Sequence, residues 1–374
     1  MSLDAADSGH LREALDLARQ SRARTSPNPA VGAVIVRDGE IAGRGFHTWE
    51  GVKHAETLAL EQAGERARGA TLYINLEPCS HQGRTGPCVD ALIAAGVRRV
   101  VAAMEDPNPM VRGEGFRKLR AAGIETEIAS GFAAEAGWIN EPFIHFMRTG
   151  RPLVTLKTAL TLDGKIAAPD DNRGWITSER ARLHVQQIRH ESDAILTGIG
   201  TVLADDCLLT DRTGLPRSRP LLRIVLDSQL RVPLDSKIVT SAAECGDLLV
   251  VATSAASTER RRALEARGAA VLVCDGPGGR ADFATAVEWL AARKYLSLMI
   301  EAGSKVNWAA FEAGVVDKIF FYFGAKILGG VESLPVAGGV GKRRRMDAIQ
   351  VERTRIHLIE PDEFAVEGYV HRDY

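Results

Sequence analysis

The sequence has few of the features that mark nucleic-acid-binding or membrane proteins. Aromatic residues make up only 6% of its 374 residues and the formal net charge is −1, which argues against a base-stacking platform or a basic groove. No apolar run approaches the length of about 18 residues that spans a membrane. The basic run at residues 342–345 is interpreted as a solvated loop. We therefore expect neither a nucleic acid nor a membrane as a partner.

Cysteine is also sparse, with five residues in the whole chain. Three of them, Cys207, Cys245 and Cys274, are scattered without the spacing of a disulfide framework. The first ten residues include two aspartates and no apolar stretch, so no signal peptide is expected. Both features favour a reducing, cytoplasmic environment.

The length and composition predict a globular protein of two domains. A chain of 374 residues is too long for one ordinary hydrophobic core. Its content of 45% hydrophobic and 25% charged residues is typical of globular proteins. A basic turn with glycine and proline at 148–152 favours domains of residues 1–147 and 151–374.

His54, Cys79 and Cys88 form the most informative pattern in the sequence. Each cysteine follows a proline, and Glu56 lies two residues after the histidine. One imidazole and two thiolates can hold zinc and leave the fourth tetrahedral position open for water. The order His-x-Glu…Pro-Cys is the signature of zinc deaminases, although their usual Cys-x-x-Cys is stretched here. The pattern therefore predicts a zinc site made by His54, Cys79 and Cys88.

Glu56 is expected to carry protons beside this site rather than to bind the metal. Zinc lowers the pKa of a bound water to about 7, so that the water can attack a ring carbon bearing an exocyclic amine. Glu56 would then pass the proton to the departing ammonia. Two alternatives stay open at this point: a structural zinc whose fourth ligand is His47 or His81, and a core histidine with two buried thiols.

Hydrophobic periodicity predicts alternating helices and strands over the first 147 residues. The expected helices are 11–21, 54–63, 87–95 and 116–122. The expected strands are 30–36, 41–46, 71–76, 98–104 and 124–128, the first two joined by a turn at Asp38-Gly39. This order predicts an α/β sandwich with metal ligands at helix starts, where the helix dipole stabilises thiolates.

The second half begins a new strand–helix pattern. Strands are expected at 153–160, 194–198 and 320–323, and a helix at 178–190. No Gly-x-Gly-x-x-Gly supports a Rossmann domain. The segments 198–201 and 301–304 each follow an apolar strand and could bring backbone amides to a phosphate, but they could equally be simple turns.

Several motifs together resemble those of one enzyme family. In the first half they are Ser26-Pro27-Asn28-Pro29, His54-Ala55-Glu56, the segment 77–85 and Asp106-Pro107-Asn108-Pro109. In the second half they are Lys157-Thr158-Ala159, the segments 162–165, 175–178 and 197–206, Leu226-Asp227-Ser228 and Glu301-Ala302-Gly303. Over nearly its whole length the chain is similar to the bifunctional riboflavin-biosynthesis deaminase–reductases. The resemblance implies a cytidine-deaminase-like α/β/α domain followed by a dihydrofolate-reductase-like α/β domain.

The resemblance also implies two consecutive reactions on a phosphorylated pyrimidine. The first domain would use zinc to deaminate 2,5-diamino-6-(5-phosphoribosylamino)pyrimidin-4-one. The second would use NADPH to reduce the ribosyl chain, which gives 5-amino-6-(5-phosphoribitylamino)uracil. A homo-oligomer, either a dimer or a tetramer, is expected. The alternative is a zinc nucleobase or nucleoside deaminase with a non-catalytic second domain.

The motifs assign candidate residues by resemblance. The NADPH positions are Ala159, Trp175, Thr201, Asp205, Ser228, Gly303, Ser304, Lys305, Val306, Asn307, Trp308 and Ala309. The substrate positions in the second half are Arg173, Arg189, Leu209, Arg212 and Glu301. In the first half, Asn28 and the polar-loop residues His81 and Arg84 are candidate substrate contacts, with plain solvation as the alternative for the loop. Three positions depart from the family pattern, since Gly86 stands where proline is common, Arg173 where serine is frequent and Cys207 where proline is usual.

Lys157 and Asp205 are the candidate catalytic residues of the second half. Reduction at the anomeric carbon needs a hydride donor and a proton donor for the ring oxygen, and these two side chains are polar and lie within the motifs. Arg189 and Arg212 suit a phosphate, because a guanidinium can bind two of its oxygens. The alternatives are a solvent-facing strand lysine, an aspartate that only caps a turn, and an exposed helix arginine at 189.

Overall fold

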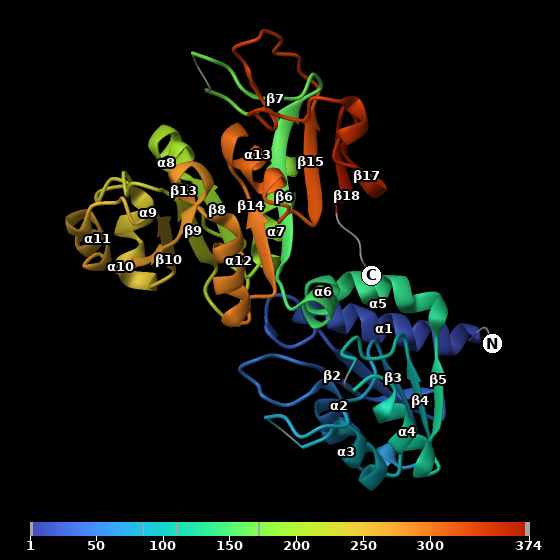
Figure 1. The fold of residues 1–374 in the computed structure, drawn as a ribbon. Helices are drawn as coiled ribbons and strands as arrows, with labels where there is room; N and C mark the ends of the chain where they lie inside the picture. The colour runs from blue at the N-terminus through green and yellow to red at the C-terminus, as the bar shows by residue number, and fades with distance from the viewer. Residues whose placement is uncertain (1–2, 85, 110, 171–172, 371–374) are drawn as a thin grey trace. The chain divides into compact units, whose positions relative to one another are not determined.

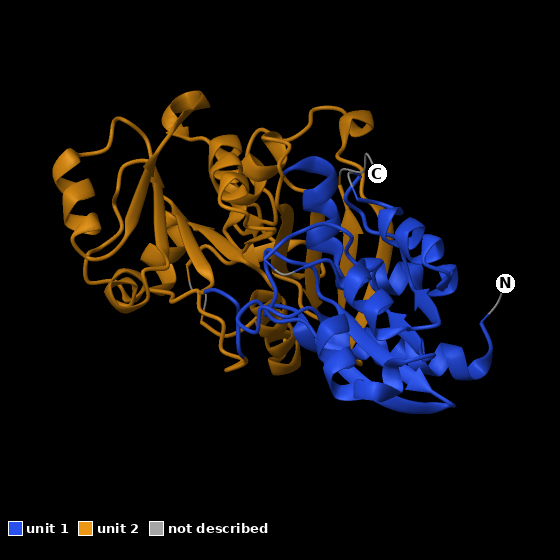
Figure 2. Cartoon of the chain, turned by 90° about the horizontal axis from the view of Figure 1, so that it is seen from below, with its two compact units in different colours: residues 1–150, 216–219 blue, residues 151–215, 220–374 orange. Residues whose placement is uncertain are grey.

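Two compact units make up the protein. The structure is a computed structural model that describes residues 3–84, 86–109, 111–170 and 173–370. Thr85, which ends one of the motifs above, lies outside the described residues. The first unit comprises residues 1–150 and 216–219, and the second comprises 151–215 and 220–374 (Figure 2).

The short segment 216–219 belongs to the first unit although the sequence places it within the second half. The amide of Ser218 donates a hydrogen bond to the carbonyl oxygen of Ala23 over 2.8 Å. Its hydroxyl donates to the carbonyl oxygen of Ser26 over 3.2 Å. The chain therefore crosses between the units at 150/151 and twice more around this segment.

The first unit is a mixed sheet with helices on both faces (Figure 1). Its strands are β1 (Gly32–Arg37), β2 (Glu40–Phe46), β3 (Thr71–Ile74), β4 (Arg99–Ala102) and β5 (Glu125–Ile128), in the order β2-β1-β3-β4-β5. Its helices are α1 (Ala5–Ser21), α2 (Ala55–Ala63), α3 (Cys88–Ala95), α4 (Glu114–Ala121), α5 (Ala133–Ile139) and α6 (Glu141–Thr149). Strand β1 is antiparallel to β2 and β3, whereas β3, β4 and β5 are parallel. The expected α/β/α fold is confirmed.

Two apolar layers hold this sheet between its helices. On one face, Leu11 and Leu15 of α1 pack with Val34 of β1 and with residues of α5. On the other face, α2, α3 and α4 pack against the alternate side chains of the strands, including Ile35 and Leu72. The alternation along the strands is what the period of two in a β-strand requires.

The expected helices and strands of this unit are present, with shifted ends. Helices α2 and α3 each begin one residue later than expected, because His54 and Pro87 have extended backbones and occupy the N-cap positions. The turn at Asp38-Gly39 is confirmed, and both residues have positive φ, 53° and 79°. Helices α5 and α6 were not predicted; they occupy the segment that precedes the expected domain boundary at 148–152.

The second unit contains a larger, mostly parallel sheet (Figure 1). The sheet order is β11-β10-β9-β8-β14-β6-β15-β18-β17. Its strands are β6 (Leu153–Thr161), β8 (Ala194–Gly198), β9 (Leu222–Leu226), β10 (Leu248–Ala252), β11 (Ala270–Val273), β14 (Ser297–Ile300), β15 (Lys318–Gly324), β17 (Glu352–Glu360) and β18 (Glu363–Tyr369). Two small ribbons pair β7 (Lys165–Ala167) with β16 (Leu334–Pro335) and β12 (Asp275–Gly276) with β13 (Arg280–Ala281). Among the described strands of the large sheet, β18 is antiparallel to both of its neighbours, β15 and β17, and the other neighbouring strands are parallel.

Helices cover both faces of this sheet as well. They are α7 (Glu179–Glu191), α8 (Ile199–Asp205), α9 (Lys237–Thr240), α10 (Ala242–Cys245), α11 (Thr258–Glu265), α12 (Phe283–Ala292) and α13 (Ser304–Glu312). Helices α12 and α13 pack on one face, and α7 to α11 on the other. Strands β8, β14 and β6 are adjacent and parallel, so their carboxyl ends meet at one edge, which is where open α/β sheets bind ligands.

No helix within the described part of the chain combines the length and the apolar character needed to cross a membrane.

Candidate active sites

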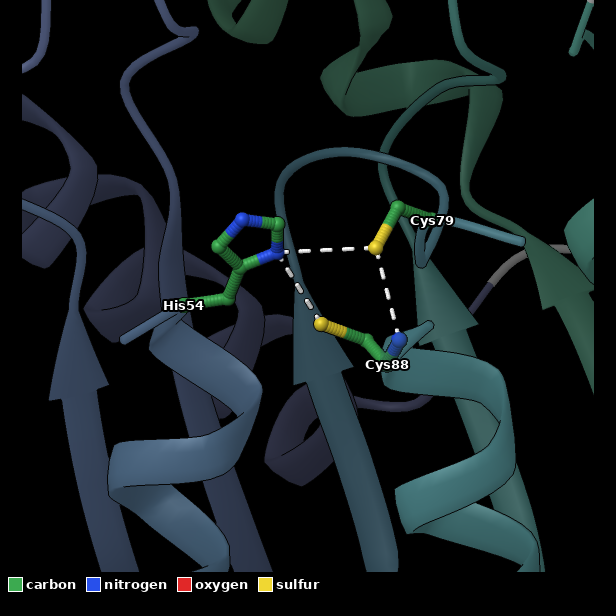
Figure 3. Close-up of side chains that lie close together, drawn as sticks. All are labelled: His54, Cys79 and Cys88. Carbon is green, nitrogen blue, oxygen red and sulfur yellow. Dashed lines mark hydrogen bonds between the residues drawn. The ribbon is translucent and has the colours of Figure 1, made fainter. Parts of the chain in front are cut away.

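The three predicted metal ligands of the first unit lie together (Figure 3). His54 precedes α2, Cys88 begins α3, and Cys79 lies in the loop after β3. His54 Nδ1 is 3.1 Å from Cys88 Sγ and 3.5 Å from Cys79 Sγ. All three ligand atoms lie within 4.8 Å of one another, and no other histidine, cysteine or carboxylate of the described residues joins the group. One nitrogen and two sulfurs at this spacing fit zinc with an open fourth position.

The pKa values of the two cysteines show that their thiolates need a cation between them. Hydrogen bonds from Cys88 and from His54 lower the pKa of Cys79, so this thiol ionises readily. The same contact with Cys79, together with burial, raises the pKa of Cys88, because a second thiolate beside the first is repelled. A divalent cation between them would stabilise both thiolates, which is the state that binds metal.

Glu56 lies in the first turn of α2, close to this group but outside it. It is only 3% exposed, and burial, with the neighbouring Cys79, raises its pKa to about 7. A nearby metal cation would favour the carboxylate again. Burial favours the protonated form of Glu56 and a metal cation favours the ionised form. A carboxyl group for which both forms are accessible suits proton transfer.

Neither histidine that could have closed the metal site does so. His47 engages both ring nitrogens elsewhere, with Nδ1 2.9 Å from the carbonyl oxygen of Lys53 and Nε2 3.0 Å from Asn28 Nδ2. Burial lowers its pKa, which keeps the ring neutral. His81 is exposed in the loop between the cysteines. The geometry thus favours a site that is open to a small molecule.

The candidate substrate contacts of the first unit are held by different neighbours. Asn28 is connected to the metal ligands through His47, whereas Arg84 is held by Trp49. Asn28 is linked to them through His47, whose ring centroid is 5.2 Å from that of His54. Arg84 stacks on Trp49, with Cζ 4.2 Å from the ring centroid, and Nη1 donates to the Trp49 carbonyl oxygen over 3.2 Å. No sequence motif indicated that Trp49 or His47 would contact these residues.

In the second unit, Lys157, Arg189 and Glu301 form one cluster. Lys157 Nζ is 3.0 Å from Glu301 Oε1, and Arg189 Nε is 3.0 Å from Glu301 Oε2. Arg189 Nη1 also donates to the carbonyl oxygen of Thr210 over 3.1 Å. The side chains of Lys157 and Arg189 are only 9% and 12% exposed. The alternatives of a solvent-facing lysine and an exposed helix arginine are therefore wrong.

The charges of this cluster lower the pKa of its carboxylate and sum to a net positive charge. Burial alone would raise the pKa of Glu301, but Lys157 and Arg189 lower it to about 2. Lys157 Nζ also lies 5.8 Å from the centroid of the Tyr322 ring, a residue that no sequence motif indicated. Two cations around one carboxylate leave a net positive charge, which suits a phosphorylated substrate.

Asp205 ends helix α8, an element that was not predicted from the sequence. Asp205 is the last residue of the helix and is exposed, but partial desolvation of its carboxyl group raises its pKa. Cys207 follows, and its pKa rises to about 11 through burial and the nearby Asp205. Leu209 is buried with a positive φ of 53°. The candidates Arg212 and Arg173 are exposed.

The remaining NADPH candidates surround the carboxyl ends of β8 and β14. Gly198 ends β8, and Gly303 is the N-cap of the nine-residue helix α13. A Cβ added at Gly200 or at Gly303 would meet no atom within 4 Å, so the backbone there is open to a ligand. A helix N-terminus beside such glycines is suited to a phosphate.

Buried polar atoms nearby support this fit to a dinucleotide. Thr197 Oγ1, Asn307 Oδ1 and Trp308 Nε1 are buried, and the described residues give them no hydrogen-bond partner. Such atoms are normally satisfied by a ligand or water. Two other candidates are engaged within the protein, since Ser228 Oγ accepts from the Ala281 amide and the exposed Trp175 ring stacks against Arg182. The remaining candidates are partly exposed (Ala159, Thr201, Val306 and Ala309), buried (Ser304) or exposed (Lys305).

Comparison with known proteins assigns both units. Residues 5–104 match the family model of the cytidine and deoxycytidylate deaminase zinc-binding region, and residues 152–360 match that of the RibD C-terminal domain. The riboflavin biosynthesis protein RibD of Escherichia coli (strain K12) is 41% identical over 372 residues, covering 95% of this chain and 97% of that protein. The RibD protein of Actinobacillus pleuropneumoniae is 40% identical over 356 residues, covering 95% and 93%.

Solved structures give the same result. The structure of Acinetobacter baumannii RibD matches with a TM-score of 0.85 at 34% identity, covering 98% of this chain and 99% of that chain. A Thermotoga maritima protein described as a diaminohydroxyphosphoribosylaminopyrimidine deaminase/5-amino-6-(5-phosphoribosylamino)uracil reductase matches with a TM-score of 0.79 at 31% identity, covering 98% and 99%. The chain therefore belongs to the RibD family of riboflavin biosynthesis, whose members combine a zinc-dependent deaminase with an NADPH-dependent reductase.

Proposed function

We propose that the first unit deaminates 2,5-diamino-6-(5-phosphoribosylamino)pyrimidin-4-one and that the second reduces the deaminated product. The observation that carries this proposal is the group of His54, Cys79 and Cys88 with buried Glu56 beside it. The substrate is inferred from the description of the Thermotoga maritima relative. In this assignment residues 1–147 hold the deaminase site and residues 151–374 the reductase site.

In the deaminase site, His54, Cys79 and Cys88 hold the metal and Glu56 moves the protons. Zinc, when bound, supplies an activated water at neutral pH. Glu56 takes a proton from the attacking water and delivers it to the exocyclic amine, which leaves as ammonia. Because Glu56 is buried with a pKa raised to about 7, it can both accept and release a proton near neutral pH. Asn28, His81 and Arg84 are assigned to substrate binding.

In the reductase site, Glu301 orients the two cations and Asp205 provides a proton. NADPH, when bound, supplies the hydride for the anomeric carbon. The bond from that carbon to the ring oxygen breaks, and the oxygen needs a proton, for which Asp205 is the assigned donor; desolvation raises the pKa of its carboxyl group, which favours this role. Glu301 holds Lys157 and Arg189 in fixed positions for the polar groups of the substrate. Arg173, Leu209 and Arg212 are assigned to the same substrate, and the NADPH candidates named above to the cofactor.

The decisive experiment is incubation with the proposed substrate, with and without NADPH, followed by mass measurement of the products. Without NADPH, the amine should be replaced by a carbonyl and ammonia released. With NADPH, the product should gain two further hydrogens. If NADPH is consumed without prior deamination, or if ammonia is released from free nucleosides instead, the substrate assignment is wrong.

Substituting Asn for Asp205 should lower the reductase kcat by about 10²-fold or more and change NADPH affinity little. A proton donated mainly in the transition state contributes to kcat rather than to cofactor binding. Steady-state rates on the deaminated substrate and a fluorescence titration with NADPH measure the two effects. Asp206→Asn is the matched control, because Asp206 accepts from the Lys237 amide at the surface. Lost NADPH binding with an unchanged kcat would make Asp205 a cofactor ligand only.

Substituting Gln for Glu301 should raise the reductase KM and lower the free energy of unfolding of the second unit. Gln keeps the shape but leaves two largely buried cations without their carboxylate, a change that costs about 1–3 kcal/mol. Substrate kinetics and thermal unfolding measure both effects, and deaminase activity in the same chain should stay unchanged. Glu288→Gln, an exposed change on α12, is the control. Equal behaviour of the two variants would show that the cluster has no role in the reaction.

We also propose that the enzyme is cytoplasmic and forms a homo-oligomer. The described cysteines are all free, as expected in a reducing compartment. Ile356 and Leu358 on the edge strand β17 are 69% and 82% exposed, which offers an apolar surface to a second copy. Sedimentation analysis distinguishes a dimer from a tetramer.

A further inference from the structure

His47 occupies a buried position between the metal ligands and a candidate substrate contact. It follows strand β2 and is 3% exposed. Its backbone amide donates to the carbonyl oxygen of Val31 over 3.0 Å. Its ring lies edge-on to that of His54, with the ring centroids 5.2 Å apart. The ring therefore has a fixed place beside the metal site without being a ligand.

The contacts of the His47 ring define which nitrogen carries the hydrogen. Nδ1 lies 2.9 Å from the carbonyl oxygen of Lys53. A carbonyl oxygen can only accept a hydrogen bond, so Nδ1 must be the protonated nitrogen. In a neutral ring Nε2 then has a lone pair and can only accept. A buried imidazole without a paired carboxylate is expected to be neutral.

This tautomer determines the orientation of the Asn28 amide. The partner of Nε2 is Asn28 at 3.0 Å, and an accepting nitrogen requires the amide NH₂ on that side. The Asn28 backbone is held as well, because its amide donates to the Thr25 carbonyl oxygen over 2.8 Å. The side-chain carbonyl oxygen of Asn28 consequently points away from His47, and no described residue donates to it.

We propose that His47 is a positioning residue of the deaminase, which fixes Asn28 so that its side-chain carbonyl oxygen accepts a hydrogen bond from an N–H or O–H group of the pyrimidine substrate. This inference rests on the proposed role of Asn28 in substrate binding. It also defines specificity, because a ligand with a lone pair at that position would face the lone pairs of Asn28. Mismatched polar groups in a buried site discriminate more strongly than size does.

Two substitutions of His47 test whether its role is to orient Asn28 through a hydrogen bond or only to fill space beside the metal site. Phe fills the site but cannot accept from Asn28, so His47→Phe should raise the deaminase KM about tenfold and change kcat less than about threefold. Gln can place an oxygen near the position of Nε2, so His47→Gln should restore most of the loss in KM. Zinc content should stay at about one per chain in both variants. Reductase activity on the deaminated substrate is the internal control for folding.

A double-mutant cycle with Asn28 tests the physical link. Asn28→Ala should raise KM by itself, and adding His47→Phe to it should cause no further loss, because His47 acts through Asn28. Asn28→Asp should be as poor as Asn28→Ala, since a carboxylate would set an acceptor against the accepting Nε2. An unchanged KM in Asn28→Ala would refute the substrate-binding role of Asn28 and the inference with it.

Other outcomes would overturn the inference alone. One is a raised deaminase KM in Asn28→Ala with an unchanged KM in His47→Phe. The others are additive increases in KM in the double variant, or equal increases in His47→Phe and His47→Gln. Lost zinc in His47→Phe would assign His47 to the metal site instead. A fully active Asn28→Asp would mean that His47 donates to residue 28 and that the amide has the opposite orientation.

Discussion

Deamination should fall by about 10²–10⁴-fold when Glu56 is replaced by Gln, while zinc stays bound. The amide keeps the shape of the side chain but can neither take a proton from water nor give one to the leaving amine. Glu56 is near the three ligand atoms but is not one of the group that could hold the ion. Metal content, ammonia release and reduction of supplied deaminated substrate are the three measurements.

The matched control for this variant is on the same helix. Glu61 of α2 is half exposed and pairs with Lys53 at the surface, so Glu61→Gln should change none of the three measurements appreciably. A Glu56→Gln protein that lacks zinc would show Glu56 to be a ligand, which contradicts its assignment as the proton carrier.

Loss of both metal and deaminase activity is expected when Cys79 or Cys88 is replaced by Ser. A serine hydroxyl is a far weaker zinc ligand than a thiolate, and only three protein ligands are present in the group. Zinc should fall from about one per chain to a small fraction, and the NADPH-dependent reduction should persist. Elemental analysis, with assays of each activity, tests this.

Cys245 provides the control for the cysteine variants because it is exposed in the second unit. Cys245→Ser should keep full zinc content and both activities. The expectation fails if metal-free protein, prepared by chelation or by either ligand variant, deaminates at the normal rate.

The zinc group could be predicted from sequence because its signal is local. His54, Cys79 and Cys88 lie within 35 residues at fixed spacings from Glu56 and two prolines, and helix starts can be recognised from such patterns. The hairpin at Asp38-Gly39 was predictable for the same reason, since two residues with positive φ select this turn.

The contacts that organise both sites could not be predicted, because they join residues distant in sequence. Lys157 and Glu301 are 144 positions apart and meet only when β6 pairs with β14. His47 and Asn28 are 19 apart, and nothing in either neighbourhood specifies a ring nitrogen as partner of an amide. Helix α8 was missed because its glycine, threonine and valine are weak helix formers, and the helix is held by packing of Ile199 and Val202.

The order of strands in the second unit has a consequence for biosynthesis. Strand β6 is the first strand of its sheet to leave the ribosome, yet both of its neighbours, β14 and β15, come from late in the chain. Until residue 300 has emerged, β6 has no partner, and its second edge stays unpaired until residue 324 has emerged, a state that folds slowly and invites aggregation. The sheet of the first unit is complete by residue 128, so a nascent chain can enclose its metal ligands long before its second sheet can close.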